Sequence, residues 1–210
     1  MAKNKTSRQW VHDHINDPYV KQAQAQGYRS RAAFKLLQID ERDRLLGPGK
    51  VVVDLGSTPG GWSQVAAKKA LPGGRVIALD LLPMEPVTGV HFIQGDFRED
   101  ETLVQLVSAL DGRPVGLVLS DMAPNLTGIA LTDQARSIHL LELALEFSRE
   151  YLKGGGDMLV KVFQGTGFDT LRRDMEQLFD TVSVRKPDSS RDRSAEVYLL
   201  CRGRRGEPSV

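Results

Sequence analysis

The sequence has few cysteines and histidines and no long apolar run. Among its 210 residues Cys201 is the single cysteine, which excludes an internal disulfide. The four histidines are scattered without the spacing of a zinc site, so we expect no metal. No stretch of about 18 apolar residues exists, and the first residues lack a signal-peptide pattern. We therefore expect neither a membrane span nor secretion. The expected location is the cytoplasm.

Charge of either sign is nearly balanced over the whole chain, at a net +1, but it is unevenly placed. Residues 1–50 contain ten Lys or Arg and five Asp or Glu, and residues 185–205 contain seven and three. Two basic ends around a mildly acidic middle favour a polyanionic partner such as a nucleic acid. Judged by charge alone, basic ends that are simply solvated and have no partner are an equally good explanation.

The length and a hydrophobic content of 40% predict one domain with one core. We expect a basic, partly ordered N-terminal arm over residues 1–29, a single domain over 30–203 and a flexible tail over 204–210. A helix is predicted to begin at Ser30 as N-cap and to end at the Gly47–Lys50 turn. Seven apolar runs are strand candidates, namely residues 51–55, 75–80, 90–96, 115–121, 157–163, 181–185 and 196–201.

These strand candidates alternate with helical stretches, which is the pattern of a mainly parallel sheet covered on both faces. The longest helix is predicted to begin at Thr132 or Asp133 and to stop at Gly154–Gly156. Only ten residues separate the last two strands, too few for a crossover helix. The fold class is therefore α/β, with six parallel strands and an antiparallel seventh.

A glycine-rich segment, DLGSTPGGW, follows the first strand. A Walker loop requires a lysine after its last glycine, but Trp62 follows Gly61. A dinucleotide fingerprint requires G-x-G-x-x-G, whereas the glycines here are Gly56, Gly60 and Gly61. The spacing thus disfavours a bound polyphosphate and weakens the case for an NAD-dependent oxidoreductase.

Acidic residues close three successive strands, at Asp54, Asp80 and Asp96. Each alone is most simply a cap or turn residue. Together they suit S-adenosylmethionine, because its ammonium group, ribose and base each offer donors, whereas carboxylates repel a pyrophosphate. Phe97 adds a ring that can stack on adenine.

The segment that closes the fourth strand, LSDMAPN, has no aromatic residue to stack on a flipped base, which disfavours methylation of an exocyclic base nitrogen. Cys201 lies at the far end of the last strand, poorly placed as the nucleophile of base C5 methylation. Lys161 is different, because lysine is rare inside a central strand unless it is paired or functional. A lysine that extends to solvent from an edge strand is the alternative.

Topology brings the remaining candidates to one edge of the sheet. Ligands of open α/β sheets bind outside the carboxyl ends of the parallel strands, where Asp121 and Lys161 fall. Glu196 starts the antiparallel strand and so lies at the same edge. We expect Asp121, Lys161 and Glu196 to converge, in a site where a lysine assists a weakly acidic ribose hydroxyl.

Five segments, SRAAFKL, VVDLGSTPGGWSQV, LSDMAPN, VKVFQGTGFD and DSSRDRSAEVYLL, resemble those of the FtsJ (RrmJ, RlmE) family of ribosomal-RNA 2′-O-ribose methyltransferases, in the same order. The resemblance covers about Trp10 to Arg202 and departs at Ser57-Thr58, where the family usually has two smaller residues. It implies a Rossmann-like, S-adenosylmethionine-dependent enzyme. Bacterial members methylate a uridine ribose in the A-loop of 23S rRNA in the large ribosomal subunit.

The resemblance also implies a catalytic tetrad of Lys35, Asp121, Lys161 and Glu196. Lys161 would be the general base, or would position the 2′-hydroxyl, with Asp121 orienting it near the transferred methyl. Lys35 would position the substrate and favour the neutral form of Lys161, and Glu196 would hold the lysines. The expected cofactor contacts are Asp54, Gly56, Pro59, Gly60, Trp62, Asp80, Asp96, Phe97 and Asp121.

Basic residues near both ends are expected to hold RNA phosphates: Arg8, Lys21, Arg29, Arg31, Arg191 and Arg193. We expect a monomer without a metal. Two alternatives remain open, a 2′-O-methyltransferase acting on tRNA or another RNA, and a noncatalytic RNA-binding ribosome-assembly factor.

Overall fold

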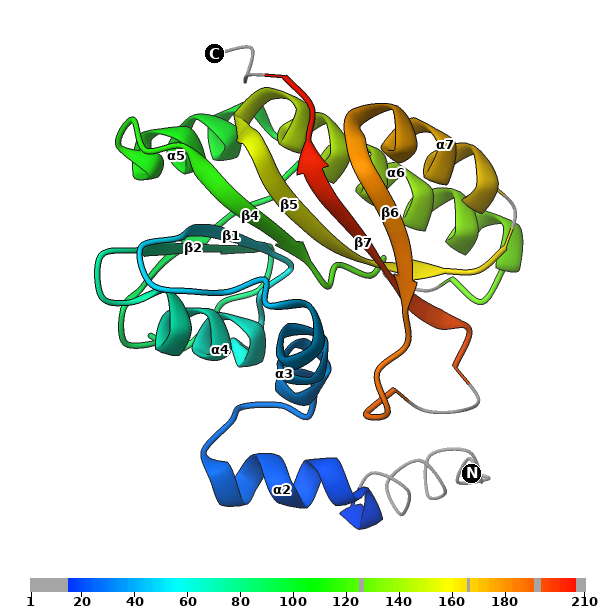
Figure 1. Cartoon of the computed structure of the whole chain (residues 1–210). Helices are drawn as coiled ribbons and strands as arrows, with labels where there is room; N and C mark the ends of the chain where they lie inside the picture. The colour runs from blue at the N-terminus through cyan, green and yellow to red at the C-terminus, as the bar shows by residue number, and fades with distance from the viewer. Residues whose placement is uncertain (1–14, 125–126, 166, 191–193, 207–210) are drawn as a thin grey trace.

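In the computed structural model, residues 15–124, 127–165, 167–190 and 194–206 are described, and they form a seven-stranded sheet with helices on both faces (Figure 1). The helices are α2 Pro18–Gln26, α3 Ala32–Asp43, α4 Gly61–Ala70, α5 Asp100–Leu110, α6 Ala130–Tyr151 and α7 Phe168–Leu178. The strands are β1 Val51–Leu55, β2 Arg75–Asp80, β3 Val90–Gln94, β4 Val115–Ser120, β5 Leu152–Phe163, β6 Phe179–Arg185 and β7 Glu196–Arg204.

The strand order is β3-β2-β1-β4-β5-β7-β6, and β7 is antiparallel to both of its neighbours. The predicted α/β class, the seven strands and the antiparallel seventh strand are therefore confirmed. β7 lies between β5 and β6, so β5 is an inner strand and Lys161 does not extend from an edge.

Side-chain alternation along the strands divides the core into two layers. Val51 and Val53 of β1 pack with α5, α6 and α7, whereas Val52 packs with α3 and α4. Successive strand residues point to opposite faces of the sheet, so alternate residues along a strand pack against the same set of helices. Figure 1 shows α5, α6 and α7 over one face and α3 with α4 over the other.

The predicted helix caps were wrong. α3 begins at Ala32 with Arg31 as N-cap, because Ser30 contributes its carbonyl rather than its hydroxyl to the first turn. α6 begins at Ala130, and Asp133 instead accepts hydrogen bonds from Thr127 and Gly128 in the preceding turn.

The predicted glycine stop was also wrong. α6 ends at Tyr151, and the chain enters β5 directly at Leu152, so Gly154–Gly156 belong to the strand. Gly155 has a φ of +72°, next to an irregular register between β4 and β5, which is the kind of position where a glycine accommodates a bulge.

The helix α2 was missed by the sequence reasoning, although its signals are present. Asp17 accepts a hydrogen bond from the Tyr19 amide as N-cap, Pro18 is the first helical residue, and Gly27 ends the helix at a φ of +72°. α2 packs against α3 through Tyr19 and Phe34, so part of the predicted arm joins the domain.

Candidate active site

The four residues of the predicted tetrad lie close together, because Lys161 and Glu196 point to the same face of the sheet and α3 packs on that face. Lys161 on β5 lies on the α3 side of the sheet, since its neighbours Val160 and Val162 pack on the other side. In the same way, Glu196 shares the face of Tyr198, whose ring packs with α3 and α4. Asp121 follows β4 directly, and α3 carries Lys35 to this edge of the sheet.

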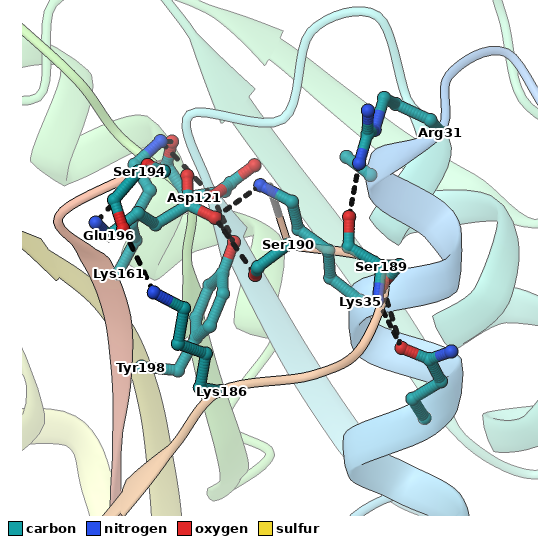
Figure 2. Close-up of polar contacts among 12 residues, drawn as sticks. Arg31, Lys35, Asp121, Lys161, Lys186, Ser189, Ser190, Ser194, Glu196 and Tyr198 are labelled. Atoms are coloured by element: carbon teal, nitrogen blue, oxygen red, sulfur yellow. Dashed lines mark hydrogen bonds and ion pairs between the residues drawn. The ribbon is translucent and has the colours of Figure 1, made fainter. Parts of the chain in front are cut away.

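Each of the two lysines is paired with one of the two carboxylates (Figure 2). The Lys161 ammonium nitrogen donates to the Asp121 carbonyl at 2.6 Å and lies 3.1 Å from Asp121 Oδ1. The Lys35 Nζ lies 2.5 Å from Glu196 Oε1. The four side chains thus form two ion pairs at the carboxyl ends of the parallel strands.

Tyr198 joins the two pairs, and the sequence reasoning missed it. Its hydroxyl oxygen lies 3.2 Å from Asp121 Oδ1 and 3.3 Å from Glu196 Oε1, so its proton is donated to one carboxylate at a time. Burial and these two carboxylates raise the pKa of Tyr198, which keeps its proton in place. Its place in the sequence could have indicated it, because a residue two positions after Glu196 on a strand lies on the same face. In the sheet Tyr198 is directly opposite Lys161.

Glu196 is largely buried yet ionised. Burial opposes its charged form, but the charge and hydrogen bond of Lys35, the charge of Lys161 and the Tyr198 hydroxyl outweigh it and hold its pKa below the usual range. The Ser190 hydroxyl donates a further bond at 3.3 Å. Glu196 is therefore a fixed negative charge that can keep both lysines near one another.

Residues 186–190, which follow β6, form one wall of the site. The Ser189 amide and hydroxyl donate to Gln38 Oε1 of α3, at 2.9 and 2.8 Å. Arg31 donates to the Ser189 carbonyl (Figure 2). It also forms an ion pair with Asp17. Arg31, predicted as an RNA contact, therefore has protein partners on both sides.

The second half of the candidate site is the loop after β1. Asp54 is fully buried, and its Oδ2 accepts a hydrogen bond of 2.6 Å from Ser63. Within the described part of the chain, no hydrogen-bond partner reaches its Oδ1. Burial, which the Ser63 bond only partly offsets, and the nearby Asp121 and Asp80 raise the pKa of Asp54 to about 7. A buried carboxylate with one unsatisfied oxygen fits a ligand that carries positive charge.

Glycine is required at two positions of this loop. Gly56 has a φ of +75°, and a Cβ there would lie 2.6 Å from Met122 Cγ. Gly60 has a φ of +106° and precedes the first turn of α4, where a Cβ would lie 2.9 Å from Met84 Sδ. The bare backbone at Gly56 lets the loop approach the segment after β4, and Pro59 lies between the two glycines.

The other predicted cofactor residues have their own protein contacts. Asp80 accepts the amides of Thr58 and Leu82, at 2.8 and 2.9 Å, so it connects the loops after β1 and β2. Asp96 forms an ion pair of 2.5 Å with Arg98, and the Phe97 ring packs edge-on against Phe147.

Trp62 is buried. Its indole N–H donates to the Ala32 carbonyl, and its ring packs 5.6 Å from that of Tyr198. The side chain of Trp62 thus supports the site from within the core.

Of the predicted RNA contacts, Lys21 is exposed on α2, whereas Arg29 donates to three backbone carbonyls. Arg8, Arg191 and Arg193 lie outside the described residues. The described ranges contain no group of three His, Cys, Asp or Glu side chains arranged to hold a metal. They also contain no helix long and apolar enough to cross a membrane.

Comparison with known proteins identifies the family. The sequence profile of the FtsJ-like methyltransferases matches residues 28–204, which include the loop after β1 and all four tetrad positions. The chain belongs to the FtsJ-like methyltransferase family. It is therefore an enzyme of the methyl-transfer class.

Individual FtsJ-like relatives are similar over nearly the whole chain. A protein of an Azoarcus species, named ribosomal RNA large subunit methyltransferase E, is 64% identical over 95% of this chain and 98% of its own length. The protein of that name from Chromobacterium violaceum is 58% identical over 98% of this chain and all of its own. A crystal structure described as that of a ribosomal RNA methyltransferase from Plasmodium falciparum superposes with a TM-score of 0.74. It is 30% identical and covers 85% of this chain and 100% of its own.

Proposed function

We propose that this protein transfers a methyl group from S-adenosylmethionine to the 2′-hydroxyl of a ribose in RNA, a uridine in the A-loop of 23S rRNA. The observation that carries the proposal is the acceptor side of the site. Two lysines and two carboxylates lie within hydrogen-bond distance in pairs, whereas the Tyr198 ring beside them and Cys201 further along β7 are fully buried. The relatives named for the large-subunit rRNA support the substrate class.

On the donor side, Asp54, Gly56, Pro59, Gly60 and Asp80 would hold the cofactor, with Trp62 supporting the loop from the core. The fit rests on the unsatisfied Oδ1 of Asp54, which complements a cationic ligand. It also rests on Gly56, which has no side chain and so lets the loop lie close to Met122. Bound there, S-adenosylmethionine supplies a methyl group activated by a sulfonium charge. Asp96 and Phe97 remain predicted contacts of its base.

On the acceptor side, Lys161 holds the 2′-hydroxyl and accepts its proton when it carries the free pair, since a ribose hydroxyl is too weak an acid to react unaided. Asp121 fixes the Lys161 nitrogen through two oxygens and lies between the donor and acceptor sides. Lys35 contributes positive charge, and Glu196 fixes Lys35. Correct alignment of the hydroxyl with the methyl group supplies much of the rate enhancement.

We also propose that the enzyme acts as a monomer in the cytoplasm, on large ribosomal subunits. Phosphate contacts from the basic arm and the β6–β7 loop would provide affinity, while RNA shape would select the target. Lys21 is the described candidate for such a contact, because its side chain is exposed on α2.

The test is transfer of labelled methyl from S-adenosylmethionine to large ribosomal subunits, by the wild type and by Lys161→Ala. We expect Lys161→Ala to reduce the single-turnover rate about a thousandfold while cofactor affinity stays within twofold, because loss of a general base costs that order of rate. Near-normal turnover of the folded variant would exclude Lys161 from the reaction. Methyl recovered on a base would contradict the reaction class, and preference for purified tRNA would contradict the substrate.

A further inference from the structure

Arg29 lies in the linker between α2 and α3, a place where the sequence predicts a contact with RNA. Its guanidinium group instead points at the protein. Nη1 donates to the Pro59 carbonyl at 3.2 Å and to the Glu85 carbonyl at 2.5 Å, and Nη2 donates to the Pro86 carbonyl at 2.6 Å. One half-buried side chain thus binds three backbone oxygens.

Those three carbonyls belong to the two loops that border the donor side of the site. Pro59 lies in the loop after β1, and Glu85 and Pro86 lie in the loop after β2. Asp80 joins the same two loops at the sheet edge, through the amides of Thr58 and Leu82. Arg29 therefore provides a second connection between the two loops, in addition to the one made by Asp80.

The linker itself is fixed to α4. The Arg29 amide donates to Gln64 Oε1 at 2.9 Å, and Gln64 Nε2 donates to the Gly27 carbonyl at 3.0 Å. Arg29 Nη1 also lies 3.1 Å from the position that a Cβ on Gly60 would take, so the guanidinium packs directly on the loop. The linker and the two loops form one connected unit.

Arginine suits this position better than lysine. A guanidinium has five donors in a planar fork, so it can serve carbonyls from two loops at once, whereas an ammonium is a compact charge without that geometry.

We propose that Arg29 is a positioning residue for methyl-donor binding, holding the loops after β1 and β2 in the arrangement that receives the cofactor. The inference rests on the proposed use of S-adenosylmethionine. Loops that are ordered before binding do not have to be ordered by the ligand, and this raises affinity. The role assigned to Arg29 is therefore on the cofactor side, away from RNA.

The test compares Arg29→Ala, Arg29→Lys, Lys21→Ala and Arg172→Ala with the wild type. Arg172 is a matched arginine on α7, paired with Glu176 on the opposite face of the sheet. Calorimetry with S-adenosylmethionine and filter binding of a 23S rRNA transcript containing the A-loop give the two dissociation constants. Thermal unfolding checks the fold of each variant.

For Arg29→Ala we expect cofactor affinity to fall roughly tenfold or more, with a matching rise in KM for the cofactor, kcat within threefold and RNA affinity within twofold. Arg29→Lys should restore part of the cofactor affinity. Lys21→Ala should weaken RNA binding alone, and Arg172→Ala should change neither constant.

Weakened RNA binding with unchanged cofactor affinity in Arg29→Ala would overturn the inference and make Arg29 an RNA contact. If Arg29→Ala does not fold, Arg29→Lys decides, because cofactor affinity equal to the wild type would show that the fork is not needed. Failure of the wild type itself to bind S-adenosylmethionine would refute the proposed function instead.

Discussion

Asp54 is a fully buried carboxylate and Glu196 a largely buried one on the same face of the same sheet, and their pKa values are shifted in opposite directions. Lys35 and Lys161 overcome the burial of Glu196 and hold its pKa low. Asp54 has only the Ser63 hydroxyl against complete burial, and its pKa rises to about 7. The protein itself provides partners for the charge of Glu196, whereas Oδ1 of Asp54 has no hydrogen-bond partner among the described residues.

The largest test of this difference is Asp54→Asn. We expect affinity for S-adenosylmethionine to fall about a hundredfold, since a buried charge loses its partner, while the cofactor-free protein is no less stable than the wild type. Calorimetry and thermal unfolding measure the two effects. Glu196→Gln is the matched control and should show the reverse, lower stability with near-normal cofactor affinity. Equal stability losses in both variants would contradict the comparison.

The second test removes Lys35, which should leave Glu196, like Asp54, a carboxylate without its ion-pair partner and with a raised pKa. We expect Lys35→Met to lower the free energy of unfolding by about 2 kcal/mol, because a largely buried carboxylate loses its partner. Urea unfolding measures this loss. The double variant Lys35→Met/Glu196→Gln should be less destabilised than the sum of the single variants, and strict additivity would show that the pair does not interact.

The third test uses pH. Asp54 has a pKa of about 7 in the folded protein against 3.8 for an unperturbed aspartate, so between these values the folded state holds a proton that the unfolded chain has released. Stability of the cofactor-free protein from this group therefore declines as pH rises from about 4 to about 7. A cationic ligand favours the ionised carboxylate, so its affinity should rise roughly tenfold between pH 6 and pH 8.

Calorimetry of S-adenosylmethionine at the two pH values provides the measurement. Asp54→Asn is the control, because its remaining affinity should lack this dependence on the Asp54 proton. The same pH slope in both proteins would assign the titration to another group.

The sequence was informative where pattern and topology determine position. Near-continuous apolar strands predicted the sheet, and the short connection before Glu196 predicted the antiparallel β7, which places Glu196 beside β5. Lysine in an inner strand was a sound indicator of a special environment, since Lys161 is paired with Asp121 there.

Details that depend on local competition between hydrogen bonds were less predictable. Ser30 and Asp133 are common cap residues, yet the backbone of the first turn and the amides of Thr127 and Gly128 determine what they do. Charge alone suggested RNA for Arg29 and Arg31, but it does not show that backbone carbonyls lie within reach. Tyr198 carried no signal in composition, because its role depends on facing Glu196 and Asp121 in space.

The inner position of β7 has a consequence for how the enzyme comes into being. β7 separates β5 from β6 although it follows both in the chain, and it carries Glu196 and Tyr198. The half of the site with the two ion pairs therefore cannot be complete until β7, the last described strand in the chain, has been synthesised and has inserted between β5 and β6.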